Sequence, residues 1–380
     1  MAIDPVALTQ ALVRCPSVTP DAKAALDLLQ ATLEGLGFAC ARPVFSGDGG
    51  TYPVDNLFAK RGEGTPHLAF NGHVDTVPTG DAAQWRHDPF SGAIEDGRLY
   101  GRGSADMKSG VACFVAALAE LDPWPGGAVS LLITGDEERE SINGTAKLLA
   151  WAEARGERFD ACLVGEPTCP RDLGDTAKIG RRGSVSCTLT VRGRQGHTAY
   201  PQRADNAAHH ITAVLGDLIA ARLDEGTDWF EPSNLQVTSI DIGNPAANVV
   251  PGEATARFNI RFNDRHTRVS LESWLRQRIA AHAADFTLDV ASNAEAFVTQ
   301  PGRLTEILSA SVQAVTGRTP VLNTTGGTSD ARFVQRYCPV IEFGLVGTTM
   351  HQTDEHIATA DVSGLTRIYT DFLRRFLAGG

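Results

Sequence analysis

The spacing of apolar residues over the first 180 positions switches between a helical period and short continuous runs. Leu26, Leu29 and Leu33 recur at helical spacing and predict a helix over residues 21–36. Residues 128–134, AVSLLIT, are almost wholly apolar, which is typical of a strand buried on both faces of a parallel sheet. The same criteria predict further helices at 4–14, 107–121 and 145–154 and further strands at 68–72 and 161–164. Strands that alternate with helices favour an α/β layer with a mostly parallel sheet.

The pattern changes after about residue 182. Residues 184–191, SVSCTLTV, alternate with period two, as a half-exposed antiparallel strand does. The elements expected after it are a helix at 206–222, strands at 235–241 and 253–262, a helix at 268–283 and a strand at 285–290. This β-α-β-β-α-β order predicts an α+β unit.

The α/β pattern returns towards the C-terminus, with a helix at 303–316, an apolar strand at 339–345 and a closing helix at 361–377. The sequence therefore predicts one domain formed by residues 1–182 and 294–380, and a second domain inserted at 183–293. Such an insertion at a surface loop is tolerated because the ends of a domain tend to lie close together.

The composition disfavours several classes of protein. The 380 residues carry a formal net charge of −11, which disfavours binding to nucleic acid or to anionic lipid. No apolar run approaches the ~20 residues that a membrane span needs. The first residues contain Asp4 and no basic segment, unlike a secretory signal. The seven cysteines are odd in number, scattered and without a C-x-x-C pair, so reduced thiols in a cytoplasmic protein are the simplest interpretation.

Candidate chemistry begins where the strand at 68–72 ends, at His73 and Asp75. Residues two apart in a strand point to the same side, so the imidazole and the carboxylate are expected to face one region. This pattern is compatible with a metal ligand and a carboxylate that orients it. For an isolated H-x-D an ordinary solvated loop is the more common explanation, so the rest of the chain has to decide.

Four further residues of metal-binding type follow predicted strands or open a predicted helix. Asp106 precedes the helix at 107–121, Glu138 follows the strand at 128–134, Glu166 follows the strand at 161–164, and His351 follows the strand at 339–345. In an open α/β sheet, ligands bind in the crevice beyond the carboxyl ends of the strands. Two histidines and three carboxylates can hold two zinc-like ions if one carboxylate bridges them.

Each residue also has a simpler explanation. Asp106 can be the N-cap of a helix, the acidic run 136–138 can be a solvated face, Glu166 can be a turn residue before Pro167, and His351 can lack a role. Their joint position at one edge of one predicted sheet favours a single dinuclear metal site.

At these residues the chain resembles the M20 family of metallopeptidases and deacylases. The segments that carry the resemblance occur in the family's order and span nearly the whole chain. They are GHVDTVP at 72–78, YGRGSADMKSG at 100–110, TGDEE at 134–138 and GEPT at 165–168. The resemblance implies a zinc-hydrolase catalytic domain with an inserted α+β domain that serves in dimerisation and as a lid.

The resemblance also implies roles for individual residues. Asp106 is expected to bridge two Zn²⁺ ions, for which Co²⁺ can substitute. His73 and Glu166 would complete one ion site, and Glu138 and His351 the other. It further implies that Asp75 orients His73, that Glu137 is the general base, and that the peptide bond between Asp106 and Met107 is cis.

Other segments narrow the expected substrate to N-succinyl-LL-2,6-diaminopimelate, a small acidic molecule, whose amide bond would be hydrolysed in lysine biosynthesis. These segments lie at 178–184, 192–206, 248–262 and 323–333. His197, in the inserted domain, would stabilise the oxyanion across the interface of a homodimer. The residues expected to bind the substrate are Arg181, with Arg182 as a close alternative, Ser184, Asn248, Arg261, Gly327 and Thr328.

Three alternatives stay open. One is another deacylase or carboxypeptidase of the family, such as an acetylornithine deacetylase. Another is a non-catalytic binding protein on the same fold, against which the retention of Glu137 and all five ligands argues. The third is a dinuclear phosphoesterase, which the absence of a glycine-rich phosphate loop argues against weakly.

Overall fold

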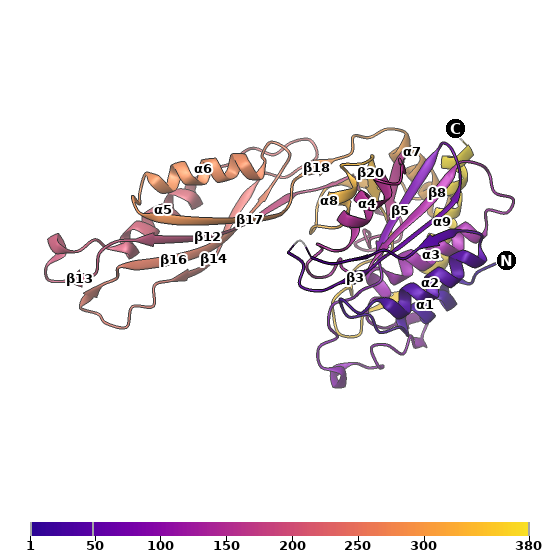
Figure 1. Cartoon of the computed structure of the whole chain (residues 1–380), viewed down its shortest axis with the longest axis horizontal. Coiled ribbons are helices and arrows are strands. Elements are labelled where there is room, and N and C mark those ends of the chain that lie inside the picture. The colour runs from indigo at the N-terminus through magenta and orange to yellow at the C-terminus, as the bar shows by residue number, and fades with distance from the viewer. Residues whose placement is uncertain (1, 48, 379–380) are drawn as a thin grey trace. The chain divides into compact units, whose positions relative to one another are not determined.

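The computed structural model describes residues 2–47 and 49–378, which form two compact units. The first unit comprises Met1–Gly180, Thr299–Asn323 and Ser329–Gly380. The second comprises Arg181–Val298 and Thr324–Thr328, so the predicted insertion at 183–293 lies wholly within it (Figure 1).

The first unit is built on an eight-stranded mixed sheet. Its order is β1 (Ala39–Ala41), β4 (Leu57–Gly62), β8 (Ala128–Thr134), β5 (His67–His73), β9 (Ala161–Val164), β20 (Val340–Glu342), β10 (Thr176–Lys178) and β19 (Val321–Asn323). The central strands β8, β5, β9 and β20 are parallel, as predicted. The flanking strands β4 and β10 pair antiparallel to them and are not predicted, because they are short and carry charged residues such as Lys60 and Arg61.

The parallel strands at the centre bring distant segments to one edge. Every residue of β5 and β8 is buried, which for β8 agrees with its nearly continuous apolar sequence. Parallel strands end on the same side of a sheet, so the segments that follow β5, β8, β9 and β20 leave the sheet at a common edge. The predicted metal ligands at positions 73, 138, 166 and 351 lie at these strand ends or in the segments that follow them.

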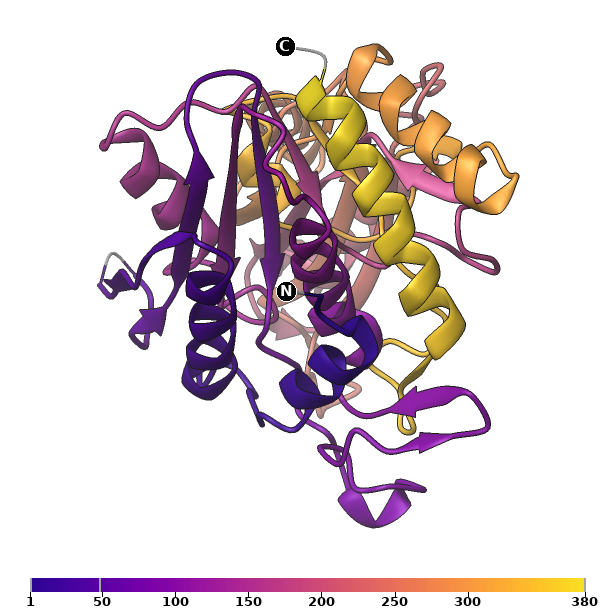
Figure 2. The same cartoon turned by 90° about the vertical axis from the view of Figure 1, so that its right-hand side faces the viewer.

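The helices of the first unit are α1 (Pro5–Val13), α2 (Lys23–Gly35), α3 (Ser109–Ala119), α4 (Thr145–Glu153), α7 (Arg303–Thr316), α8 (Ala331–Val334) and α9 (Thr359–Ala378). Helix α3 packs against α1 and α9, and α9 packs against α7 (Figure 2). Phe70 of β5 stacks on Phe114 of α3 with ring centroids 4.0 Å apart, and Tyr369 of α9 meets both rings edge-on. The hydroxyl of Tyr369 donates to the carbonyl of Phe343 at 2.6 Å, so the helix layer is tied to the sheet by one polar bond as well as by apolar contact.

A close backbone approach fixes α3 against the end of β9. A Cβ atom on Gly110 would lie 2.3 Å from the carbonyl oxygen of Gly165, a distance that a larger residue cannot adopt. Gly165 is in turn packed against the ring of Phe70, where a Cβ atom would lie 2.7 Å from Cζ. These contacts set the position of Glu166 relative to the helix that follows Asp106.

The first unit also contains shorter elements. They are β2 (Val44–Phe45), β3 (Val54–Asp55), η1 (Ala82–Gln84), β6 (Ile94–Glu95), β7 (Arg98–Tyr100), the irregular turn η2 (Ser104–Lys108) and β21 (His356–Ala358). Strand β21 pairs with β7, with His356 opposite Tyr100. The segment after His351 is thereby joined to the segment before Asp106.

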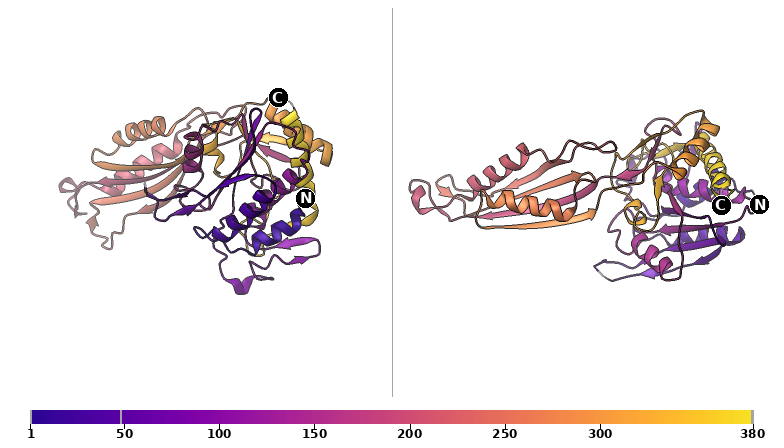
Figure 3. Two further views of the ribbon diagram at one scale, coloured as in Figure 1. Left: turned by 45° about the vertical axis from the view of Figure 1, so that its right-hand side comes forward. Right: turned by 90° about the horizontal axis from the view of Figure 1, so that it is seen from above.

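The second unit is a four-stranded antiparallel sheet covered on one face by two helices (Figure 1 and Figure 3). The strand order is β14 (Asn234–Asp241), β16 (Glu253–Phe262), β12 (Gly183–Arg192) and β17 (Phe286–Ala294), and the helices are α5 (Ala207–Ala220) and α6 (Arg268–Ala280). Val185, Leu189 and Val191 of β12 are buried in the core, whereas Ser186 between them is exposed. This is the period-two alternation that the sequence predicts.

The remaining short elements are β11 (Gly180–Arg181), β13 (Gly196–His197), β15 (Val249–Val250), β18 (Phe297–Val298) and η3 (Pro201–Arg203). Strand β13 pairs antiparallel with β15, which places His197 opposite Val249. None of the helices in the described part of the chain combines the length and the apolar character that a membrane span requires.

Candidate metal centre

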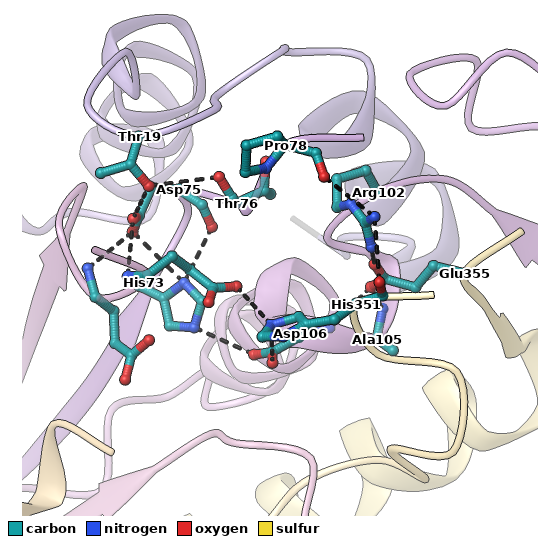
Figure 4. Close-up of polar contacts among 12 residues, drawn as sticks. Thr19, His73, Asp75, Thr76, Pro78, Arg102, Ala105, Asp106, His351 and Glu355 are labelled. Atoms are coloured by element: carbon teal, nitrogen blue, oxygen red, sulfur yellow. Dashed lines mark hydrogen bonds and ion pairs between the residues drawn. The ribbon is translucent and has the colours of Figure 1, made fainter. Parts of the chain in front are cut away.

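Asp106 lies between the two predicted histidine ligands in the first unit (Figure 4). Its Oδ1 atom is 3.2 Å from Nε2 of His73, and its Oδ2 atom is 3.3 Å from Nε2 of His351. The two oxygens of one carboxylate therefore face two different imidazoles, which is the arrangement that a bridging ligand requires.

One further carboxylate accompanies each histidine. Oε1 of Glu166 is 3.7 Å from Nε2 of His73, and Oε1 of Glu138 is 3.0 Å from Nε2 of His351. Ligand atoms of His73, Asp106 and Glu138 all lie within 4.8 Å of one another. The geometry thus divides into a His73–Glu166 half and a Glu138–His351 half that share Asp106.

The local backbone around Asp106 is not that of a helix start. Asp106 has φ −123° and ψ 102°, and the peptide bond to Met107 is cis, as the family resemblance implies. The N-cap position of α3 is occupied by Lys108, without a side-chain capping bond. The alternative that Asp106 is only an N-cap is therefore wrong.

Asp75 is fully buried and is bonded mainly to the segment after β8. Its carboxylate accepts hydrogen bonds from the main-chain N–H groups of Glu137 at 3.3 Å and Glu138 at 3.2 Å, and from the hydroxyl of Thr19 at 2.7 Å. Nδ1 of His73 lies 3.1 Å from the main-chain carbonyl oxygen of Asp75 but 3.5 Å from its carboxylate. The carbonyl of Asp75 is thus the closer acceptor for Nδ1–H, and Nε2 is left facing Asp106.

The acidic run at 136–138 is not a solvated face, because its three residues have three different environments. Asp136 is buried and accepts a hydrogen bond from Tyr52 at 2.7 Å and from two main-chain N–H groups of the following turn. Glu138 pairs with His351. Among the described residues, none donates a hydrogen bond to the carboxylate of Glu137, which is partly buried.

The electrostatics around Asp106 favour positive charge. Burial alone would raise the pKa of Asp106, but hydrogen bonds from His351 and His73 outweigh it and hold the pKa well below its usual range. Burial would lower the pKa of His73, yet its contacts with Asp106 and Asp75 raise it well above 6.5. Contacts with Asp106 and Glu138 raise the pKa of His351 to about 10.

Burial and the clustering of acidic side chains raise the pKa of two other carboxyl groups, those of Glu166 and Glu137. Burial, followed by the negative charge of Asp106, raises the pKa of Glu166 well above its usual value. Burial also raises the pKa of Glu137, and the negative charges of Asp330, Glu138 and Asp106 add to the effect while His73 opposes it. A set of carboxylate oxygens and imidazole nitrogens with surplus negative charge fits a pair of divalent cations.

The predicted substrate residues all belong to the second unit. Arg181 is 8% exposed, and its Nη1 atom donates to the carbonyl oxygens of Thr325 at 3.5 Å and Gly327 at 3.1 Å. Its guanidinium therefore holds the segment Thr324–Thr328, to which the predicted substrate residues Gly327 and Thr328 belong.

Arg261 of β16 is paired in register with Ser184 of β12. Burial and the nearby positive charge of Arg182 lower the pKa of Arg261. Arg182 lies 3.8 Å from Glu231, and Ser184 accepts a hydrogen bond from Asn259 at 3.2 Å. This unit therefore places two guanidinium groups beside each other, next to small polar side chains.

His197 is exposed, and its Nδ1 atom accepts a hydrogen bond from the main-chain N–H of Ala199 at 3.0 Å. The neutral ring must then carry its proton on Nε2, where it can be donated. The main-chain carbonyl of Asn248 accepts from the N–H of Thr198 at 3.1 Å and fixes the adjacent turn.

Three residues around the metal centre are not predicted from the sequence: Thr19, Arg102 and Glu355. Thr19 bonds Asp75, and the other two form a buried ion pair beside Asp106. Arg102 lies in the motif segment 100–110 and Glu355 lies four residues after His351, but no spacing signal marks a residue whose hydrogen bonds go to main-chain groups.

Comparison with known proteins gives consistent results. Residues 69–375 match the sequence profile described as peptidase family M20/M25/M40. A succinyl-diaminopimelate desuccinylase of Rhodospirillum centenum is 56% identical, with 100% of this chain and 99% of that protein covered. Another, of Rhodospirillum rubrum, is 53% identical, with 99% and 98% covered. A crystal structure of a dinuclear metal-binding M20 peptidase of Bacillus subtilis superposes with a TM-score of 0.69 at 14% identity, covering 97% of this chain and 96% of that one.

The shared position of Asp106 generates a prediction about metal content. After dialysis against zinc, we expect about two ions per native chain, about one for His351→Ala, and almost none for Asp106→Ala, because the latter removes a ligand from both halves. Elemental analysis of the purified proteins measures this.

His282→Ala provides the control, since His282 lies in the second unit, where its Nε2 atom is 3.6 Å from Oδ2 of Asp217. It should retain the native metal content. Two ions in Asp106→Ala would contradict the assignment of a shared ligand.

Proposed function

Because the chain belongs to peptidase family M20/M25/M40, we propose that it hydrolyses the amide bond of N-succinyl-LL-2,6-diaminopimelate with the aid of two divalent cations, releasing succinate and LL-2,6-diaminopimelate. The observation that carries the proposal is the carboxylate of Asp106, which faces His73 with one oxygen and His351 with the other. The choice of substrate is supported by two relatives named succinyl-diaminopimelate desuccinylase, which are 56% and 53% identical over nearly the whole chain. The reaction would serve lysine biosynthesis.

Five side chains would hold the cations. Asp106 would be shared, His73 and Glu166 would complete one site, and Glu138 and His351 the other. Zinc suits this set of nitrogen and oxygen donors, and cobalt is a suitable substitute. When bound, such a pair of cations supplies Lewis acidity, which lowers the pKa of water and polarises a carbonyl oxygen.

Glu137 would be the general base. Its carboxylate takes no part in the pairing among the ligands, while its main-chain N–H is held by Asp75. The burial and negative charges that raise its pKa favour acceptance of a proton from the attacking water. Glu137 would then donate this proton to the leaving amine nitrogen, so that one carboxylate serves first as base and then as acid.

Guanidinium groups would recognise the carboxylates of the substrate. Arg261 is suited to this, since the nearby positive charge of Arg182 makes the neighbourhood of Arg261 favourable for an anion. Arg182, which lies 3.8 Å from Glu231, is the alternative to Arg181. Arg181 would act through the Thr324–Thr328 segment that it holds, where Gly327 and Thr328 are expected to contribute hydrogen bonds. Ser184 and Asn248 complete the proposed set.

His197 would supply a hydrogen bond to the oxyanion that forms during attack. The support from this chain is its exposed ring, which carries the proton of the neutral form on Nε2. The family resemblance implies that the donor comes from the partner chain of a homodimer.

Hydrolysis of N-succinyl-LL-2,6-diaminopimelate by the zinc-loaded protein tests the function directly. We expect kcat/KM at least ~100-fold higher than for N-acetylornithine. That substrate has fewer carboxylates, so some guanidinium groups of the site would stay unpaired when it binds. Equal or greater activity on acetylornithine would favour the alternative deacetylase. Activity on neither substrate, with metal bound, would favour a binding protein.

Substitution of the proposed base separates chemistry from metal binding. Glu137→Gln should lower kcat by about a thousandfold or more and retain the native metal content, since it removes proton transfer but no ligand. Glu63→Gln, an exposed acid of the same unit, is the control and should behave as the native protein. Loss of metal in Glu137→Gln would make Glu137 a ligand.

A mixing experiment tests whether His197 acts across a dimer. Glu137→Gln and His197→Ala chains should each be nearly inactive while binding metal. Co-expressed, they should recover about one-quarter of native activity, because random pairing makes half of the dimers mixed and each mixed dimer has one intact site. No recovery in dimers shown to be mixed would place His197 in the site of its own chain, whereas near-native activity of His197→Ala alone would place it outside any site.

A further inference from the structure

Arg102 and Glu355 form a buried ion pair beside the metal centre. Nη1 of Arg102 is 2.7 Å from Oε2 of Glu355, and the side chains are 3% and 0% exposed. Neither residue is among the proposed ligands, and neither is the proposed base. The proposed function therefore leaves this pair without a role.

The second oxygen of Glu355 is directed at the backbone of the shared ligand. Oε1 accepts hydrogen bonds from the main-chain N–H of Ala105 at 2.8 Å and of Asp106 at 3.2 Å. Glu355 thus uses one oxygen to hold the turn that carries the Asp106 carboxylate and the other to hold Arg102.

Nη1 and Nη2 of Arg102 also donate to other segments of the centre, among them the one that contains Pro78 (Figure 4). Arg102 donates to the carbonyl oxygens of Gln352 at 3.3 Å, His351 at 3.5 Å and Pro78 at 3.3 Å. These acceptors belong to the segment after β20 and to the segment after β5. One guanidinium therefore joins the backbones on which His351 and His73 are carried.

The segment that Arg102 holds is conformationally strained. His351 has φ 62° and Asp354 has φ 58°, in the left-handed region that residues other than glycine seldom adopt. The end of this segment is tied by β21 and by Thr349, whose hydroxyl donates to the carbonyl of His356 at 2.7 Å. The carbonyls of His351 and Gln352 then depend on Arg102 for their orientation.

Stability alone is a poor explanation for such a pair. Removing two charges from water costs about as much as their attraction returns, and an apolar replacement is often no less stable. Apolar contact has no direction, however, whereas these bonds fix main-chain groups on two sides of the centre. Residues beyond the ligands that orient them commonly change metal affinity when substituted.

We propose that Arg102 and Glu355 are positioning residues that set the separation between Asp106 and His351, and thereby the affinity for the cation held by Glu138 and His351. The inference rests on the proposed dinuclear centre. Because His351 is an exposed ligand on a strained segment, its half of the centre depends on the pair more than the buried His73–Glu166 half does.

Titration of metal-stripped protein with Zn²⁺ by calorimetry tests the proposal. Arg102→Met and Glu355→Gln should each lower the affinity for the second equivalent of Zn²⁺ by about 10–100-fold. Glu355→Gln should weaken the first equivalent as well, since Glu355 also holds Asp106, whereas Arg102→Met should change it little. The visible spectrum of the Co²⁺-loaded variants should differ from the native one, because the ligand geometry at the second ion changes. In the double variant the loss of affinity for the second equivalent should be smaller than the sum of the two single effects, since the bond between Arg102 and Glu355 is common to both.

Lys60 and Glu157 provide a matched control pair. Their charged atoms are 2.8 Å apart in the same unit, and Glu157 lies beside His67, at the opposite end of β5 from His73. Glu157→Gln should leave the affinities for both Zn²⁺ equivalents and the visible spectrum of the Co²⁺-loaded protein unchanged. Arg102→Lys, which keeps the charge but loses the fork of donors, should weaken the second equivalent to an intermediate degree and serves if Arg102→Met does not fold.

The outcomes separate this inference from the function on which it rests. Variants with a lowered melting temperature but native affinities and a native Co²⁺ spectrum would show that the pair only stabilises the fold, and would overturn the inference. A native protein that bound a single equivalent would instead overturn the dinuclear centre, whatever the variants did.

Discussion

The structure of the first unit depends on one carboxylate that must face two directions at once. Asp106 meets His73 with Oδ1 and His351 with Oδ2, so three segments far apart in the sequence have to converge on a single side chain. The parallel centre of the sheet brings the strand ends to one edge. The glycine contact between α3 and the end of β9 then lets the helix after Asp106 lie directly against the backbone before Glu166.

Gathering acids at this edge is energetically unfavourable, and the fold compensates in a specific way. Buried carboxylates need hydrogen bonds or opposite charge. The structure gives Asp75 two main-chain N–H groups and a hydroxyl, and gives Asp136 a tyrosine and a turn, so these acids are satisfied by the protein itself. The carboxylates of Glu137 and Glu166 are not satisfied to the same extent, and burial raises the pKa of both. This difference distinguishes structural acids from acids available for metal and proton chemistry.

Hydrophobic periodicity and strand ends predicted much of this arrangement. The buried strands β5 and β8 and the alternating strand β12 are identifiable from their residues. The positions of His73, Glu138, Glu166 and His351 follow from parallel topology, whereas Asp106 was predicted from its place before the helix at 107–121. Short antiparallel strands such as β4 escaped prediction because their charged residues interrupt the apolar pattern. Asp75 was expected to orient His73 with its carboxylate, but the carbonyl lies closer, because the carboxylate is engaged by the segment after β8.

The roles of Arg102 and Glu355 could not be predicted from the spacing of residues in the sequence. Their hydrogen bonds, apart from the one between them, go to main-chain groups, which every residue possesses, so no pattern of side chains reveals them. A segment with left-handed backbone at His351 and Asp354 cannot be held by apolar packing alone, because such packing does not orient a carbonyl group. A planar guanidinium with several fixed donors can do so, provided that a carboxylate neutralises it inside the protein. The buried charge pair is thus better understood as a consequence of where His351 must be placed than as a source of stability.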